Sequence, residues 1–261
     1  MSLPRGRRAV LAGMLTLVGA GLAAGARPVS QGVRDLWPGA ATVVRGERSL
    51  VAGHRVPLAE LRDLAARADR AARIVGEVWG PVRAVVLFPA TDAEAAALAG
   101  TSATGGLAAM TVADRVIVLP TGYARLSATG RDVVIAHELT HVATGAIRGG
   151  RVPMWLSEGF ADYVGYRDAG IPVRVAAAEL AEEVRAGALP TRLPGPADFA
   201  PGASRAAQSY EEAWLVCRYI AERFGERALV RLYGSDVGGV LGLSRAELTA
   251  AWRDHLRREL G

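Results

Sequence analysis

The most informative segment of the chain is residues 130–166, which read GRDVVIAHELTHVATGAIRGGRVPMWLSEGFADYVGY. Their apolar residues predict two helices, one over residues 130–144 and a second over residues 155–166. Thr129 is placed to cap the first helix, and Gly145 is placed to terminate it. A loop that contains two adjacent glycines connects the two helices.

The first of these helices carries the pattern HExxH, formed by His137, Glu138 and His141. Residues four apart lie on one face of a helix, so both imidazoles can aim at one zinc ion. Glu138 follows His137 directly, which places a general base beside the zinc and its water. The pattern is short, but its flanks are apolar and helical, and two of the four histidines in the chain belong to it. These features favour a metal site over an accidental match on a surface helix.

The second helix offers a third ligand. A catalytic zinc takes three protein ligands and keeps one open position, and two histidines with one glutamate form a known set. Glu158 is separated from His141 by sixteen residues, which leaves room for a helix end, a loop and a returning helix. Asp162 lies four residues after Glu158 on the same face. It can accept a hydrogen bond from the ring nitrogen of His137 that does not bind zinc.

HExxH followed by WLSEGFADY resembles the gluzincin metallopeptidases, the group that contains thermolysin and the zinc aminopeptidases. The closest similarity is to their small peptidase MA-like members, and it covers residues 130–166. The resemblance implies the family's roles for the matching residues of this chain. These roles are zinc ligation by His137, His141 and Glu158, general base catalysis by Glu138, and orientation of a ligand histidine by Asp162.

Two departures from the family pattern narrow the activity that the resemblance implies. The spacing to Glu158 is slightly shorter than in thermolysin or the aminopeptidases. The motif G-x-M-E-N, with which aminopeptidases hold the free amine of a substrate, is absent, and residues 105–110 read GGLAAM. The resemblance therefore favours an endopeptidase.

The resemblance also implies a residue that stabilises the oxyanion. Gluzincins often use a tyrosine or histidine well after the glutamate ligand for this role, and Tyr210 is the candidate here. Tyr210 is expected at the N-terminal end of a helix, where negative charge is favoured. The alternative is that it is a packing or surface aromatic at the start of a helix.

Upstream of the motif, the chain predicts a small sheet with two helices. Helical spacing of apolar residues covers 57–79, and a β-branched strand follows over 82–88. Thr91 is expected to cap a short helix over 91–98. Two apolar runs within residues 107–119 predict a hairpin. By analogy with the family, one of its strands lies at the sheet edge and pairs with an extended peptide.

Downstream of the motif, the chain predicts mainly helices. Residues 187–208 are rich in Pro, Gly and Ala and are the best candidate for a hinge or subdomain boundary. Ser209 is expected to start a capping box with Glu212 and to open a helix that ends at Gly225. One or two further helices finish the chain, the last ending near Trp252.

Because strands precede helices, the order of elements predicts an α+β fold. The resemblance implies a zincin-like fold with a small N-terminal sheet and a helical C-terminal half. The single cysteine, Cys217, lies in an apolar helical run and is expected to be a buried thiol.

Residues 1–26 have the layout of a secretory signal peptide: three arginines precede an apolar run, and an A-x-A pattern ends at Ala26. The alternative is an uncleaved anchor that attaches the protein to a membrane through residues 9–26. Cleavage would leave residues 27–261 as a single exported domain. It would also lower the net charge from +5 to +2, since the removed segment carries three arginines and no acidic residue. No basic stripe with interleaved aromatics remains, so nucleic-acid binding is not expected.

The sequence thus predicts an exported zinc-dependent metallopeptidase that hydrolyses peptide bonds in a peptide or protein substrate. Zinc would lower the pKa of its water, and Glu138 would take the proton and pass it to the leaving amine. The alternative is a non-catalytic extracytoplasmic module that binds peptide or cell-envelope components, with zinc holding its fold.

Overall fold

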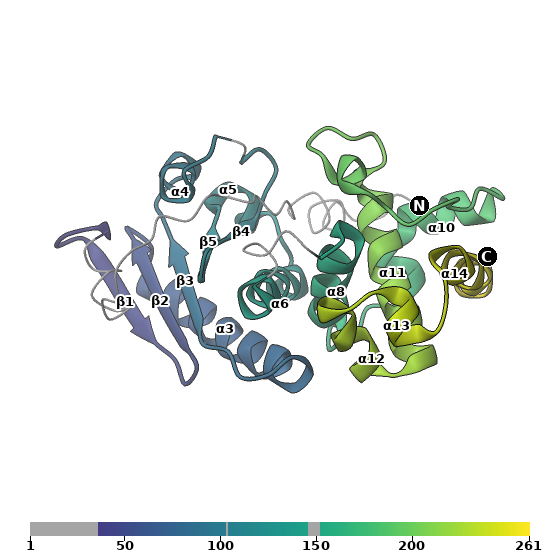
Figure 1. The fold of residues 1–261 in the computed structure, drawn as a ribbon. Coiled ribbons are helices and arrows are strands. Elements are labelled where there is room, and N and C mark those ends of the chain that lie inside the picture. Colours follow the sequence, from purple (N-terminus) through teal and green to yellow (C-terminus); the bar gives the residue numbers. More distant parts are fainter. Residues whose placement is uncertain (1–35, 103, 146–151) are drawn as a thin grey trace. The chain divides into compact units, whose positions relative to one another are not determined.

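The computed structural model describes residues 36–102, 104–145 and 152–261. The chain forms two compact units, Met1–Gly149 and Gly150–Gly261. The described part of the first unit contains a sheet and helices, and that of the second contains only helices and turns (Figure 1). The predicted signal peptide over residues 1–26 lies outside the described residues.

The sheet of the first unit has five strands in the order β1-β2-β3-β5-β4. The two inner pairs, β2–β3 and β3–β5, are parallel, while β1–β2 and β4–β5 are antiparallel. The small N-terminal sheet and the predicted hairpin are therefore confirmed. The strands are β1 (Ala41–Arg45), β2 (Ser49–His54), β3 (Ala84–Phe88), β4 (Ala109–Val112) and β5 (Arg115–Val118).

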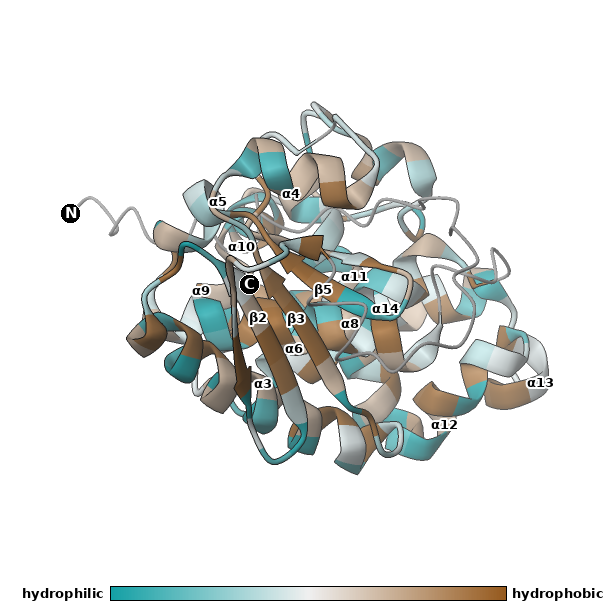
Figure 2. Cartoon of the chain, turned by 90° about the vertical axis from the view of Figure 1, so that its left-hand side faces the viewer, coloured by the Kyte–Doolittle hydropathy of each residue, from teal (hydrophilic) through white to brown (hydrophobic). Residues whose placement is uncertain are grey.

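Helices α3 and α6 pack on one face of this sheet, and the short helix α4 packs against β5 on the other. The central strands β2 and β3 are almost continuously apolar (Figure 2). On one face, Leu87, Met110 and Ile117 join a hydrophobic cluster with Ala95 of α4. On the other face, α3 packs against β1, β2 and β3, and α6 packs against β4 and β5. The helices of this unit are α3 (Leu58–Val78), α4 (Asp92–Ala99), α5 (Pro120–Ala124) and α6 (Ala128–Thr144).

The motif helix α6 begins slightly earlier than the sequence predicts. Its N-cap is Ser127, whose Oγ accepts a hydrogen bond from the backbone N–H of Gly130 at 3.0 Å, so the prediction of Thr129 as the cap is wrong. Gly145 ends the helix in the left-handed conformation, as predicted. Buried Arg67 of α3 donates to the Asp132 carboxylate at 2.8 Å and to the carbonyl of Ala128 at 2.9 Å, which ties the first turn of α6 to α3.

In the second unit, α8 and α11 form the main helix pair. Residues 187–208, predicted as a hinge or boundary, lie within this unit and include the short 3₁₀ helix Pro196–Phe199. The helices of this unit are α8 (Met154–Tyr166), α9 (Val173–Ala176), α10 (Ala178–Arg185), α11 (Ala206–Phe224), α12 (Glu226–Arg231), a 3₁₀ turn (Leu232–Gly234), α13 (Val237–Leu241) and α14 (Arg245–Leu260).

Helix α11 starts earlier than predicted, at Ala206. Ser209 therefore lies inside the helix, where its Oγ donates to the carbonyl of Arg205 at 2.9 Å, and the predicted capping box with Glu212 is wrong. Glu212 instead forms an ion pair with Arg205 at 2.8 Å. Gly225 ends α11 as predicted. Three α-helices follow it in place of the one or two predicted, and the last of them continues past Trp252 to Leu260.

Within the part of the chain that the structure describes, no helix combines the length and apolar character needed to cross a membrane.

Candidate metal centre

The two histidines of the motif lie side by side on α6. Their Nε2 atoms are 3.0 Å apart, and both rings are almost completely buried. Two nitrogen ligands of a tetrahedral zinc, each about 2.0–2.1 Å from the metal, would lie about 3.3 Å apart. The two Nε2 atoms are therefore within about 0.3 Å of the spacing that a tetrahedral zinc ion requires of two imidazoles.

The interior position of α6 accounts for this geometry. Ten residues of the helix are buried, among them Val133, Val134 and Ile135 in the turn before the histidines. The apolar flanks bury the helix against the sheet and α3, so the motif does not lie on a surface helix. This burial restricts the rotamers of both rings and keeps their nitrogens close together.

Glu138 is also completely buried, and a strand residue holds its carboxylate. The hydroxyl oxygen of Thr111 on β4 lies 2.7 Å from Glu138 Oε2 and 2.8 Å from the backbone carbonyl oxygen of Glu138. Sequence reasoning missed Thr111. The available signal was a lone hydroxyl in the otherwise apolar run LAAMTV.

The two candidate acids of the second unit lie one turn apart on α8. Glu158 and Asp162 are buried, on a helix that crosses α11 very closely. A Cβ atom added to Gly159 would lie 2.0 Å from the carbonyl oxygen of Ala213. Only glycine fits here, so the residue that follows Glu158 allows the two helices to approach.

Asp162 contributes to raised pKa values of two other buried groups in the second unit. Burial raises the pKa of Tyr166 and of the Cys217 thiol well above their ordinary values, and the nearby negative charge of Asp162 raises both further. Cys217 is buried, as predicted. The hydrogen bond from His137 to Asp162 stays a prediction.

The structure therefore groups the predicted residues by unit. His137, Glu138 and His141 lie together on α6, and Glu158 and Asp162 lie together on α8. His137, His141 and Glu158 are all buried and each offers one ligand atom, an imidazole nitrogen or a carboxylate oxygen, of the kinds that zinc binds.

Tyr210 does not open its helix, because α11 begins four residues before it. Its side chain is buried, and its ring packs edge-on against Phe199 with 5.0 Å between centroids. The premise that Tyr210 projects from a helix N-terminus is therefore wrong, and the packing role weighed as the alternative is observed. Its role as an oxyanion donor stays a prediction.

The next residue, Glu211, is a buried acid that the sequence did not single out. Its Oε2 accepts a hydrogen bond from the backbone N–H of Leu180, in the first turn of α10, at 2.6 Å. Burial raises the pKa of Glu211 to about 9, and hydrogen bonding to Glu179 adds to the rise. Glu211 is therefore protonated at neutral pH and connects α11 to α10.

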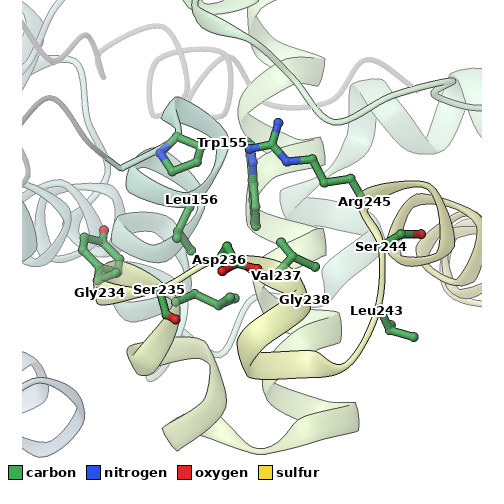
Figure 3. A pocket seen from close by; sticks show the side chains of 13 residues that line it. Trp155, Leu156, Gly234, Ser235, Asp236, Val237, Gly238, Leu243, Ser244 and Arg245 are labelled. Carbon is green, nitrogen blue, oxygen red and sulfur yellow. The ribbon is translucent and has the colours of Figure 1, made fainter.

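A pocket of about 740 Å³ lies beside the first turn of α8 (Figure 3). Trp155 and Leu156 form one side, and Asp236, Val237 and Arg245 contribute to the rest of the lining. Trp155 precedes Glu158 by three residues, so the pocket and the candidate ligand belong to neighbouring turns of the same helix.

Comparison with known proteins adds no relative. No family model matches the chain, and no curated protein matches it significantly. The support for a metal centre therefore comes from the residues of the chain itself.

Proposed function

We propose that the protein is an exported zinc-dependent metallopeptidase that cleaves internal peptide bonds of a peptide or protein substrate. The observation that carries this proposal is the buried HExxH helix, with the Nε2 atoms of His137 and His141 3.0 Å apart and Glu138 beside them. Export is inferred from the layout of residues 1–26.

The proposed zinc ligands are His137, His141 and Glu158. The spacing of the two imidazoles supports the first two. For the third, the support is a buried carboxylate on an apolar helix, separated from His141 by sixteen residues. When bound, zinc supplies a Lewis acid that polarises the scissile carbonyl and lowers the pKa of water. Asp162 is proposed to orient His137 by accepting a hydrogen bond from its second ring nitrogen.

Glu138 is proposed to move the proton. Its carboxylate accepts a proton from the attacking water and then delivers it to the nitrogen of the leaving amine. Burial of Glu138 excludes bulk water, which would otherwise compete for these transfers. Tyr210 is proposed to donate its hydroxyl hydrogen to the oxyanion.

The substrate is proposed to bind in an extended form along β4. This strand pairs with β5 and stands last in the strand order. Because Ala109, Met110 and Thr111 are fully buried, its edge must first become accessible before a peptide can pair with it. Main-chain hydrogen bonds would then hold the peptide independently of its side chains.

The test compares the wild-type protein with the Glu138→Gln variant. Both are expected to bind one zinc per chain, measured by atomic absorption. The variant should cleave fluorescein-labelled casein about 10²- to 10⁴-fold more slowly, because it lacks the general base. A variant that keeps zinc and full activity would contradict the mechanism.

The same assay separates the alternative function. Zinc bound by the wild type without turnover of casein or of other unstructured proteins would favour the non-catalytic binding module. In that case the metal would stabilise the fold, and its removal would lower the melting temperature without changing any hydrolysis.

A further inference from the structure

Thr111 ends a row of otherwise identical side chains across four strands. In register, Val51 of β2 pairs with Val86 of β3, Val86 pairs with Val116 of β5, and Val116 pairs with Thr111 of β4. All four side chains are fully buried. Threonine has nearly the shape of valine, so packing alone would be satisfied by valine at position 111.

A buried hydroxyl in such a row is costly unless it is hydrogen-bonded. Both hydrogen-bond acceptors recorded for Thr111 Oγ1 belong to Glu138: the carboxylate Oε2 at 2.7 Å and the backbone carbonyl at 2.8 Å. The hydroxyl has one hydrogen and donates to one of them at a time, and an ionised carboxylate is the stronger acceptor.

We propose that Thr111 is a positioning residue that fixes the carboxylate of Glu138 for proton transfer, an inference that rests on the proposed peptidase function. The strand supplies a rigid donor, and the hydrogen bond to Oε2 selects one orientation of the carboxylate. Without this bond, the buried side chain of Glu138 would rotate among several orientations, and fewer of them would face the attacking water.

Because Thr111 holds Oε2, the proton that Glu138 takes from the attacking water goes to Oε1, from which it can be delivered to the leaving amine. Oε2 of the protonated carboxyl still accepts a hydrogen bond from Thr111 Oγ1. The contact between Thr111 and Glu138 is thereby kept in both states of the base.

The first test removes the hydroxyl without changing the shape of the side chain. Thr111→Val should keep zinc and melt near the wild-type temperature, because the row then consists of valines. Its kcat should fall about 10- to 100-fold, the equivalent of one hydrogen bond to a charged group, while KM stays unchanged. Thr111→Ser, which restores the hydroxyl, should recover most of the lost kcat.

The matched control is Thr140→Val. Thr140 is a buried threonine of the same helix as Glu138, and its hydroxyl donates to the carbonyl of Ala136 at 2.7 Å. This variant should keep the wild-type kcat. A wild-type kcat in Thr111→Val, or an equal loss in Thr140→Val, would overturn the proposal. If Thr111→Val does not fold, Thr111→Cys carries the same test, because a thiol fills the space but donates weakly.

A second measurement separates this inference from the proposed function. If the wild type cleaves nothing, the peptidase proposal fails, and crystal structures of zinc-loaded wild type and Thr111→Val decide the positioning role. The Glu138 side chain should change rotamer or become disordered in the variant only. An unchanged Glu138 in the variant would show that the hydroxyl does not position it.

Discussion

Helices α6 and α8 both carry buried residues of the candidate metal centre, but different interactions hold these residues in place. Helix α6 packs on β4 and β5, and the carboxylate of Glu138 is held by a hydrogen bond from Thr111. Helix α8 packs on another helix, and its acids depend on the close approach at Gly159. The position of Glu138 on α6 thus depends on a directional hydrogen bond. The positions of the acids on α8 depend on a glycine that lets two helices approach closely.

The two helices also differ in how their ends are stabilised. Ser127 caps the start of α6 with its side chain, and Gly145 closes its end. Helix α8 starts after Pro153 without a side-chain cap. The conformation of α6 is therefore supported locally, whereas that of α8 depends on packing within the second unit.

Whether α6 and α8 each supply a zinc ligand is tested by removing one proposed ligand from each helix. His141→Ala and Glu158→Ala should each weaken zinc binding by more than about 100-fold, because loss of an outer hydrogen-bond partner alone costs about 10- to 100-fold. Competition with a chromophoric chelator measures the affinity. His255→Gln is the control, since His255 lies outside the motif. Wild-type affinity in Glu158→Ala would show that α8 supplies no ligand.

The packing of α8 is tested by Gly159→Ala. The added methyl group would meet the Ala213 carbonyl at 2.0 Å, so α8 and α11 must separate. Overpacking of this kind should lower the free energy of unfolding by about 3 kcal/mol, measured by urea denaturation. The control is Gly76→Ala in α3, where the nearest atom lies 3.9 Å away, and this change should stabilise by about 0.5–1 kcal/mol. Equal effects at the two glycines would contradict the close crossing.

The buried acid of α11 predicts a pH effect on the second unit. The pKa of Glu211 is about 9 in the folded protein, above its ordinary value, so the unfolded chain loses this proton at lower pH. Folding then requires proton uptake, and this group's contribution to stability falls as the pH rises from about 5 to about 9. Between pH 6 and 8 the loss should be about 3 kcal/mol, close to 1.4 kcal/mol for each pH unit.

The matched variant for this effect is Glu211→Gln, which cannot ionise but can still accept from the Leu180 N–H. Urea denaturation at a series of pH values should show a shallower decline in this variant than in the wild type. Parallel curves for the two proteins would mean that Glu211 does not carry the raised pKa.

The contribution of the N-cap of α6 to stability is expected to be smaller than the effects above. Ser127→Ala removes the side-chain acceptor for the N–H of Gly130 and should cost about 1 kcal/mol in the free energy of unfolding. Ser127→Asp keeps an acceptor and should cost less. If alanine costs nothing, the start of α6 is held by the Arg67 contacts alone.

The elements that the sequence predicted are those with a clear local signal. Helix α3 has a long apolar face, β3 is a β-branched run, and α4 has the cap at Thr91 that the structure confirms. The HExxH pattern lies on its helix because its four-residue spacing is itself a helical signal.

The first two strands were not predicted, because their signal is tertiary. Strand β2 reads SLVAGH, and its Ala52 and Gly53 have low strand propensity. The structure explains the glycine: a Cβ at Gly53 would lie 2.5 Å from the side chain of Leu61 on α3. Close packing of α3 therefore requires a residue that weakens the local strand signal.

The contact between Thr111 and Glu138 was not predictable for a related reason. It joins residues 27 positions apart, and it depends on the strand order and on the side of the sheet that α6 covers. Neither property can be read from local periodicity. The early start of α11 was missed because Ser209 and Glu212 match a capping box by spacing alone.

The alternation of side chains along β4 would make the proposed activity, once measured, a probe of folding. A slip of one residue in the β4–β5 hairpin would turn Thr111 toward the α4 side and bring Met110 or Val112 to the α6 side. Such a chain would still be compact and would still carry its histidine pair. Specific activity per bound zinc would therefore reveal misregistered molecules in a refolded preparation that size and metal content alone would pass as native.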